Sequence, residues 1–159
     1  MKTAATDSRR RARSTDLRGP IYCDASALVK LYVPEAESDD LNRTLEGRRD
    51  LLVSDLSITE IVSSLSRRRR EGNLEAATAS RLHHAILDHV EDGVYRRVEL
   101  ISATHREAER LLLSVAAVPL RAADALHLAL AVSGDAASLL TFDRRLSHAA
   151  KAIGLGVIV

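Results

Sequence analysis

Short apolar runs alternate with longer segments of helical periodicity from residue 20 to the end of this chain. Apolar runs of a few residues are typical of buried strands, whereas apolar residues repeated every three or four positions are typical of amphipathic helices. The pattern predicts strands at 21–23, 51–53, 94–100, 137–142 and 156–159. It predicts helices at 25–32, 35–47, 55–72, 74–90, 104–118, 120–132 and 143–153. Strands separated by helices require right-handed crossovers, so we expect an α/β fold with a mostly parallel sheet covered on both faces.

The composition fits one folded domain preceded by a charged arm. Of 159 residues, 46% are hydrophobic and 28% are charged, which is ordinary for a globular protein with a rigid core. Residues 1–18 lack apolar periodicity and are expected to form a flexible basic arm, with the folded domain at 19–159. Six basic and two acidic side chains give residues 1–19 a charge of +4, which leaves the remainder at −3. If a chain with this charge acted on or bound nucleic acid, it would have to attract phosphate through local patches and metal ions rather than through overall charge.

The chain shows no sign of secretion or membrane insertion. Its single cysteine, Cys23, lies in an apolar run and is expected to be a small core residue. No apolar stretch approaches the roughly 18 residues that a membrane span needs. The basic start also lacks the apolar region of a signal peptide. We therefore expect a cytoplasmic protein without membrane contact.

Acidic residues occur where predicted strands give way to helices or within the first turns of helices: Asp24, Glu60, Asp124 and Asp143. Taken singly, each has an ordinary explanation, since aspartate is a common helix N-cap and helical glutamates are mostly exposed. Taken together, they are expected to project toward the crevice at the carboxyl ends of the parallel strands. Carboxylates at close range repel one another unless a cation lies between them, so the pattern indicates a divalent-metal site.

Four blocks of sequence surround these acids and span Tyr22–Tyr32, Ser57–Ile61, Arg121–Ala129 and Leu140–Leu146. In order, spacing and flanking residues they resemble the signature blocks of PIN-domain proteins, in the branch of VapC-type toxins from toxin–antitoxin pairs. The resemblance covers residues 20–159. It implies a three-layer α/β/α sandwich, Mg²⁺- or Mn²⁺-dependent endoribonuclease activity on cellular RNA, homodimerisation, and neutralisation by a cognate antitoxin.

Carried over residue by residue, the acidic site of the family falls on Asp24, Glu60, Asp124 and Asp143. Ser26 takes the place of a polar site residue. Thr141 is expected either to assist in the same way or to satisfy a backbone group at the strand exit. We expect Asp24 and Asp124 to be direct metal ligands, with Asp143 completing the site directly or through water. Glu60 would hold or deprotonate the attacking water, and oxygen ligands favour Mg²⁺ or Mn²⁺ over zinc.

Other polar residues near these blocks allow two interpretations. Consecutive arginines follow Glu60 by about two helical turns, at Arg67, Arg68, Arg69 and Arg70. Contact with RNA phosphates and a solvated helix end explain them equally well. His127 follows Asp124 by three residues, so it faces the same side of its helix. We expect it to border the site as a core or supporting residue rather than as a metal ligand.

Two other functions compete with a nuclease. A non-catalytic RNA-binding or partner-binding module would keep the fold without cleavage, but the presence of all four acids argues against it. An aspartyl-phosphate enzyme would use Asp24 as a nucleophile and requires a second aspartate two residues later, where Ser26 stands.

An antitoxin helix would need exposed apolar surface, for which the candidates are Leu28, Leu31, Tyr32 and Leu65. Core packing is the alternative explanation for that apolar stripe.

Overall fold

The computed structural model describes residues 18–35 and 38–159. The predicted arm at residues 1–18 therefore lies outside the described residues, except for Arg18. A five-stranded sheet in the order β3-β2-β1-β4-β5 forms the centre of the fold, and each neighbouring pair of strands is parallel. The strands are β1 (Ile21–Cys23), β2 (Leu51–Ser54), β3 (Tyr95–Val98), β4 (Ser138–Leu140) and β5 (Gly156–Ile158). The predicted α/β fold with a parallel sheet is confirmed.

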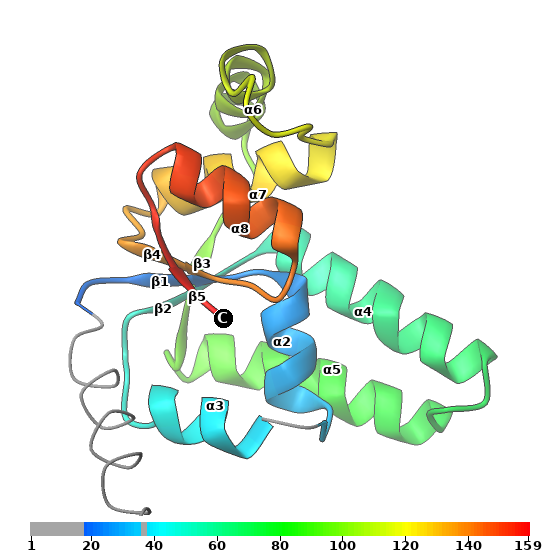
Figure 1. The fold of residues 1–159 in the computed structure, drawn as a ribbon. Helices are drawn as coiled ribbons and strands as arrows, with labels where there is room; N and C mark the ends of the chain where they lie inside the picture. The colour runs from blue at the N-terminus through cyan, green and yellow to red at the C-terminus, as the bar shows by residue number, and fades with distance from the viewer. Residues whose placement is uncertain (1–17, 36–37) are drawn as a thin grey trace, which may run out of the picture.

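Two layers of helices enclose the sheet, as Figure 1 shows. The first layer follows β1 and β2 and contains α2 (Ala25–Tyr32), α3 (Ser38–Leu45), α4 (Asp55–Arg70) and α5 (Ala76–Glu91). The second layer follows β3 and β4 and contains α6 (Ser102–Ser114), α7 (Ala122–Ser133) and α8 (Arg144–Ala152). The result is the expected three-layer α/β/α sandwich. No helix in the described ranges is long and apolar enough to cross a membrane.

Each central strand contributes side chains to both faces of the sheet because successive residues point in opposite directions. In β1, Ile21 and Cys23 join the core under the first helical layer, whereas Tyr22 joins the core under the second. Leu139 and Leu140 of β4 divide between the two cores in the same way. All five of these residues are fully buried, so the prediction that Cys23 is a core residue is confirmed. Strands buried on both faces read as continuous apolar runs.

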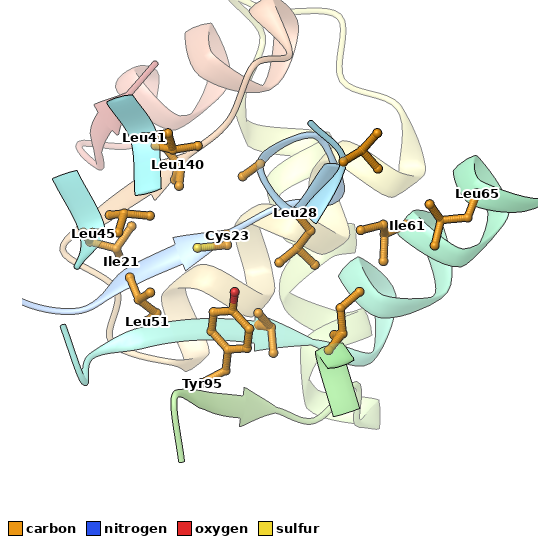
Figure 2. Packing of buried hydrophobic residues seen from close by; sticks show 14 residues of the cluster. Ile21, Cys23, Leu28, Leu41, Leu45, Leu51, Ile61, Leu65, Tyr95 and Leu140 are labelled. Carbon is orange, nitrogen blue, oxygen red and sulfur yellow. The ribbon is translucent and has the colours of Figure 1, made fainter. Parts of the chain in front are cut away.

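The first core joins the sheet to α2, α3, α4 and α5 through interdigitating aliphatic side chains. Figure 2 shows Leu28 of α2 near Ile61 of α4, with Cys23 and Tyr95 from the sheet beside them. Ile61 is 0% exposed, and burying such a side chain stabilises the fold by about 1.5–3 kcal/mol. This packing fixes the start of α2 and the body of α4 relative to the strand ends.

Two strands end earlier than their apolar runs predicted, because side chains take over their backbone hydrogen bonds. The predicted strand at 137–142 ends as β4 at Leu140, since the N–H of Phe142 donates to Ser26 Oγ at 2.8 Å. The predicted strand at 94–100 ends as β3 at Val98, and the N–H of Leu100 donates to an Asp55 carboxylate oxygen at 3.1 Å. Polar side chains near strand ends thus compete with the sheet for backbone donors.

Candidate active site

The connections of the sheet diverge between β1 and β4, because the helices that follow these two strands pack on opposite faces. The helix after β1, α2, packs on the first face, whereas the helix after β4, α8, packs on the second. Open α/β sheets bind their ligands at such a switch point. Asp24 directly follows β1 and Thr141 directly follows β4, so the fold brings these two predicted site residues together.

Asp24 is the most deeply buried of the four predicted acids, with 3% of its surface exposed. It is the N-cap of α2, and its Oδ1 accepts a hydrogen bond from the N–H of Ala27 at 2.8 Å. Oδ1 also accepts the hydroxyl of Ser26 at 2.7 Å, while Oδ2 accepts the hydroxyl of Thr141 at 2.6 Å. One position therefore serves both as a helix cap and as the centre of a polar cluster.

Ser26 and Thr141 brace the Asp24 carboxylate in the same way. Ser26 Oγ accepts from the N–H of Phe142 at 2.8 Å, and Thr141 Oγ1 accepts from the N–H of Asp143 at 3.0 Å. A backbone N–H can only donate, so each hydroxyl keeps its single proton for Asp24. The loop after β4 thus orients both hydroxyls toward one carboxylate. Thr141 satisfies a backbone group, as one of its two interpretations held, and it also contacts Asp24, while its assistance in the site stays a prediction.

The position of Asp24 makes its ionised form costly. Burial raises the pKa of the Asp24 carboxyl above its ordinary value, and the hydrogen bonds from Thr141, Ala27 and Ser26 oppose this only in part. An asparagine would cap the helix without a buried charge. A buried ionisable group at the end of a parallel strand therefore makes Asp24 a candidate for a functional site.

Glu60 extends from α4 and meets His127, which comes from α7. Glu60 Oε2 lies 2.8 Å from His127 Nε2. The Glu60 side chain is 37% exposed, whereas the His127 side chain is 4% exposed. The expectation that His127 is a buried residue beside the acids is confirmed by this contact.

His127 also contacts a buried polar cluster that includes Tyr22, which lies in the apolar run of the predicted strand at 21–23. Tyr22 Oη lies 2.9 Å from His127 Nδ1, 2.7 Å from Ser54 Oγ and 3.1 Å from Ser57 Oγ. Ser57 in turn donates to the carbonyl of Cys23 at 2.9 Å. A signal for this cluster was present in the sequence, since a tyrosine in a central strand needs a buried partner for its hydroxyl.

Asp124 and Asp143 both use one carboxylate oxygen to cap a helix. Asp124 Oδ2 accepts from the N–H of Arg121 at 2.9 Å and lies 3.7 Å from the Arg145 guanidinium. Asp143 Oδ1 accepts from the N–H groups of Arg145 and Leu146 at 2.7 and 3.0 Å. The Asp124 side chain is 13% exposed, and Asp143 lies at the surface.

The predicted acids do not form a closed metal cage. Among the described residues, no group of three or more His, Cys, Asp or Glu side chains is placed to hold a metal ion. Their donor chemistry nevertheless fits a hard cation. Both oxygens of Asp24 accept hydrogen bonds, whereas Glu60, Asp124 and Asp143 each have one anchored oxygen. Glu60 Oε1, Asp124 Oδ1 and Asp143 Oδ2 accept no hydrogen bond from the described part of the chain. Open carboxylate oxygens are the ligands that Mg²⁺ takes while it keeps several waters.

The arginines at the end of α4 occupy different environments. Arg68 forms an ion pair with Glu35 and is partly buried. Arg67, Arg69 and Arg70 are exposed. Arg68 is therefore committed to the packing of the first helical layer, and RNA contact by the exposed arginines stays a prediction.

The apolar stripe suggested for antitoxin docking belongs to the core. Leu28 is 0% exposed and Leu65 is 2% exposed, and Leu31 and Tyr32 pack against the same cluster. Core packing, the alternative explanation for this stripe, therefore holds for Leu28 and Leu65, whereas Leu31 and Tyr32 are only partly buried. The large exposed apolar side chains of the described ranges lie elsewhere, at Ile101, Leu112, Leu113, Val132 and Val159.

Comparison with known proteins places this site in a family. The chain matches the PIN domain over residues 21–152. Ribonuclease VapC46 of Mycobacterium tuberculosis is 37% identical over 140 residues, which cover 87% of this chain and 95% of that protein. This chain belongs to the PIN-domain family of VapC ribonucleases. Ribonuclease VapC35 of the same species is likewise 37% identical, over 146 residues that cover 87% of this chain and 95% of the relative.

Solved structures agree with the fold of this VapC-family protein. PAE2754 from Pyrobaculum aerophilum superposes with a TM-score of 0.64 at 24% identity, covering 87% of this chain and 83% of its own. Mycobacterium tuberculosis VapC20, described as a Sarcin-Ricin loop cleaving toxin, superposes with a TM-score of 0.65 at 18% identity. That match covers 81% of this chain and 94% of VapC20. At these identities the likeness concerns the fold alone.

Proposed function

We propose that this VapC-family protein is a divalent-metal-dependent endoribonuclease that hydrolyses phosphodiester bonds in RNA. The names of VapC46 and VapC35, both ribonucleases, support RNA as the substrate. The observation that carries the proposal is the buried carboxylate of Asp24 at the switch point, braced by the hydroxyls of Ser26 and Thr141. A site of this kind is where α/β folds place their chemistry.

Asp24, Asp124 and Asp143 are the proposed ligands of Mg²⁺ or Mn²⁺. In Asp124 and Asp143 a helix-capping hydrogen bond holds one carboxylate oxygen and thereby fixes the direction of the second. In Asp24 the cap holds Oδ1, and the Thr141 hydroxyl orients Oδ2. When bound, a divalent cation lowers the pKa of water and offsets the charge that develops on the phosphate. Arg145, 3.7 Å from Asp124, partly neutralises that carboxylate when it carries no cation.

Glu60 is the proposed general base. Its Oε2 is held by His127, and its Oε1 is open to accept a proton from the attacking water. The exposed arginines Arg67, Arg69 and Arg70 are candidate contacts for RNA phosphates along α4.

The family also suggests a biological setting for this chemistry. We propose that the protein acts as a toxin on cytoplasmic RNA, forms a homodimer, and is neutralised by a cognate antitoxin. Co-expression with the product of an adjacent small reading frame should give a complex on purification. Light scattering of the purified protein should give twice the mass of one chain, and a monomer would contradict the dimer.

Asp24→Asn tests the nuclease proposal because it keeps the size of the side chain and its ability to cap α2. RNA cleavage in Mg²⁺ or Mn²⁺ should fall by roughly 10²-fold or more, since each 1.36 kcal/mol of lost transition-state stabilisation is tenfold in rate. The exposed Asp88 of α5 offers a matched control, and Asp88→Asn should leave cleavage unchanged. Undiminished cleavage by folded Asp24→Asn protein would refute the proposed site.

Metal binding should also appear without any activity measurement. Saturation with Mn²⁺ at 100 times its Kd should stabilise the folded state by about 2.7 kcal/mol. Asp124→Asn should abolish most of that stabilisation, because it removes a charged ligand. RNA binding without cleavage, at any Mn²⁺ concentration, would favour a non-catalytic module instead.

A further inference from the structure

A continuous chain of side-chain hydrogen bonds links the interior of the sheet to Glu60. It runs from Ser54 Oγ to Tyr22 Oη at 2.7 Å, and from Tyr22 Oη to His127 Nδ1 at 2.9 Å. It continues from His127 Nε2 to Glu60 Oε2 at 2.8 Å. Ser54 and Tyr22 are 0% exposed and His127 is 3% exposed, so water does not compete for these groups.

The direction of each hydrogen bond in this chain follows from its carboxylate end. An ionised Glu60 can only accept, so His127 Nε2 must carry a proton and donate it. In a neutral imidazole the other nitrogen is then an acceptor, so Tyr22 Oη donates to His127 Nδ1. Burial raises the pKa of Tyr22 far above its ordinary value, which keeps the phenol protonated as a donor.

The serines complete the same pattern. Ser57 uses its proton on the carbonyl of Cys23, at 2.9 Å. Ser54 Oγ accepts from the N–H of Ser57 at 3.1 Å, which leaves its own proton for Tyr22 Oη. Every polar group of the buried cluster is thereby satisfied in one arrangement, so the position of the His127 ring is determined by its surroundings.

We infer that His127 is a positioning residue that holds the Glu60 carboxylate in its working orientation, with Tyr22 donating to the other nitrogen of the His127 ring. The inference rests on the proposed function, in which Glu60 is the general base. Glu60 has a long side chain that is 37% exposed, and no other described residue forms a hydrogen bond with its carboxylate. Without His127 that carboxylate would sample several rotamers in water.

The tautomer can be tested in the unaltered protein without any cleavage measurement. Long-range ¹H–¹⁵N spectra of the full chain at neutral pH should show His127 as the neutral form with its proton on Nε2. In Tyr22→Phe protein the proton should stay on Nε2 beside Glu60, whereas the Nδ1 resonance should shift, because Nδ1 no longer accepts a hydrogen bond. A proton on Nδ1, or a doubly protonated ring, in the unaltered protein would overturn the inference.

Kinetics of matched variants test the positioning role. His127→Gln keeps one donor and one acceptor at the end of the side chain, so we expect kcat within about tenfold of the unaltered protein. His127→Leu keeps the volume but removes both groups, and kcat should fall on the order of 10²-fold, because a misplaced catalytic group costs about this much. KM for RNA and the Mn²⁺ affinity should each change less than threefold, because His127 is not among the residues proposed to contact RNA or the metal ion. A threefold change corresponds to about 0.65 kcal/mol at RT ≈ 0.59 kcal/mol.

His84 of α5 supplies the matched control, because it is exposed and its ring contacts the carbonyl of Ser80. His84→Gln should leave every measured quantity unchanged. Equal kcat values for His127→Leu and the unaltered protein would overturn the inference, as would equal losses in His127→Gln and His127→Leu. If the unaltered protein cleaves no RNA, the proposed function fails, whereas the spectra still decide whether the hydrogen-bond chain exists.

Discussion

Thr141→Val isolates the hydroxyl that braces Asp24, because valine has nearly the same shape as threonine. Thr141 is 0% exposed, and its Oγ1 donates to Asp24 at 2.6 Å and accepts from the N–H of Asp143 at 3.0 Å. Removing the hydroxyl leaves a buried carboxylate without one of its donors. Transfer of apolar surface alone would predict no loss of stability, since valine buries at least as much of it.

The expected cost follows from the charge of the acceptor. A hydrogen bond to a charged group contributes about 1.5–3 kcal/mol, so Thr141→Val should lower the free energy of unfolding by about that amount. Thr141→Ser keeps both hydrogen bonds and loses one buried methyl group, which costs about 0.8 kcal/mol. The variant with the more polar side chain should therefore be the more stable of the two.

Urea denaturation at neutral pH with a chelator present measures these values in the absence of bound metal. Thr104 provides a control in which loss of the hydroxyl should raise, rather than lower, the free energy of unfolding. It is 2% exposed, and its Oγ1 has no hydrogen-bond partner in the part of the chain that the structure describes. Thr104→Val should therefore stabilise the protein by about 1 kcal/mol, because it removes a buried polar group that has no partner.

The order of stabilities decides the matter. If Thr141→Val is as stable as the unaltered protein, or more stable than Thr141→Ser, then the Thr141 hydroxyl does not hold a charged Asp24. If Thr104→Val lowered the free energy of unfolding as much as Thr141→Val, removal of any buried hydroxyl would have the same cost. The proposal that the Thr141 hydroxyl holds the Asp24 carboxylate would then fail. Unchanged m-values are required for either comparison.

The remaining predictions concern Glu35 and the arginines of α4. Partial burial raises the pKa of Glu35, but hydrogen bonds from Arg68 and Lys30 outweigh it and leave the pKa below its ordinary value of 4.5. The pair therefore stabilises the protein above that pH and loses its contribution as the pH falls through the lowered pKa. Glu35→Gln should cost about 0.5–1 kcal/mol at pH 7 and nothing in strong acid, and a pH-independent difference in urea titrations would contradict this. The double variant Arg67→Gln, Arg69→Gln should reduce the salt dependence of single-stranded RNA binding by about 1.4 in log–log slope, and an unchanged slope would exclude these two residues from phosphate contact.

Much of the architecture could be read from local patterns, because each strand and helix depends mainly on its own residues. The apolar runs at β1 and β2 and the caps Asp24 and Asp143 were predicted at the positions where they occur. Strand ends were less predictable. β4 ends at Leu140 because Ser26, far away in the sequence, takes the backbone hydrogen bond of Phe142.

The linear order of residues by itself determined the alternation of strands and helices, the family, and the acids that are candidates for the site. Only the tertiary structure decided what those acids contact. The pairing of Glu60 with His127, and of Asp24 with Thr141, joins residues that are 67 and 117 positions apart. Hydrogen bonds depend on distances of a few tenths of an ångström and on direction, which are fixed by packing between elements and not by any local periodicity.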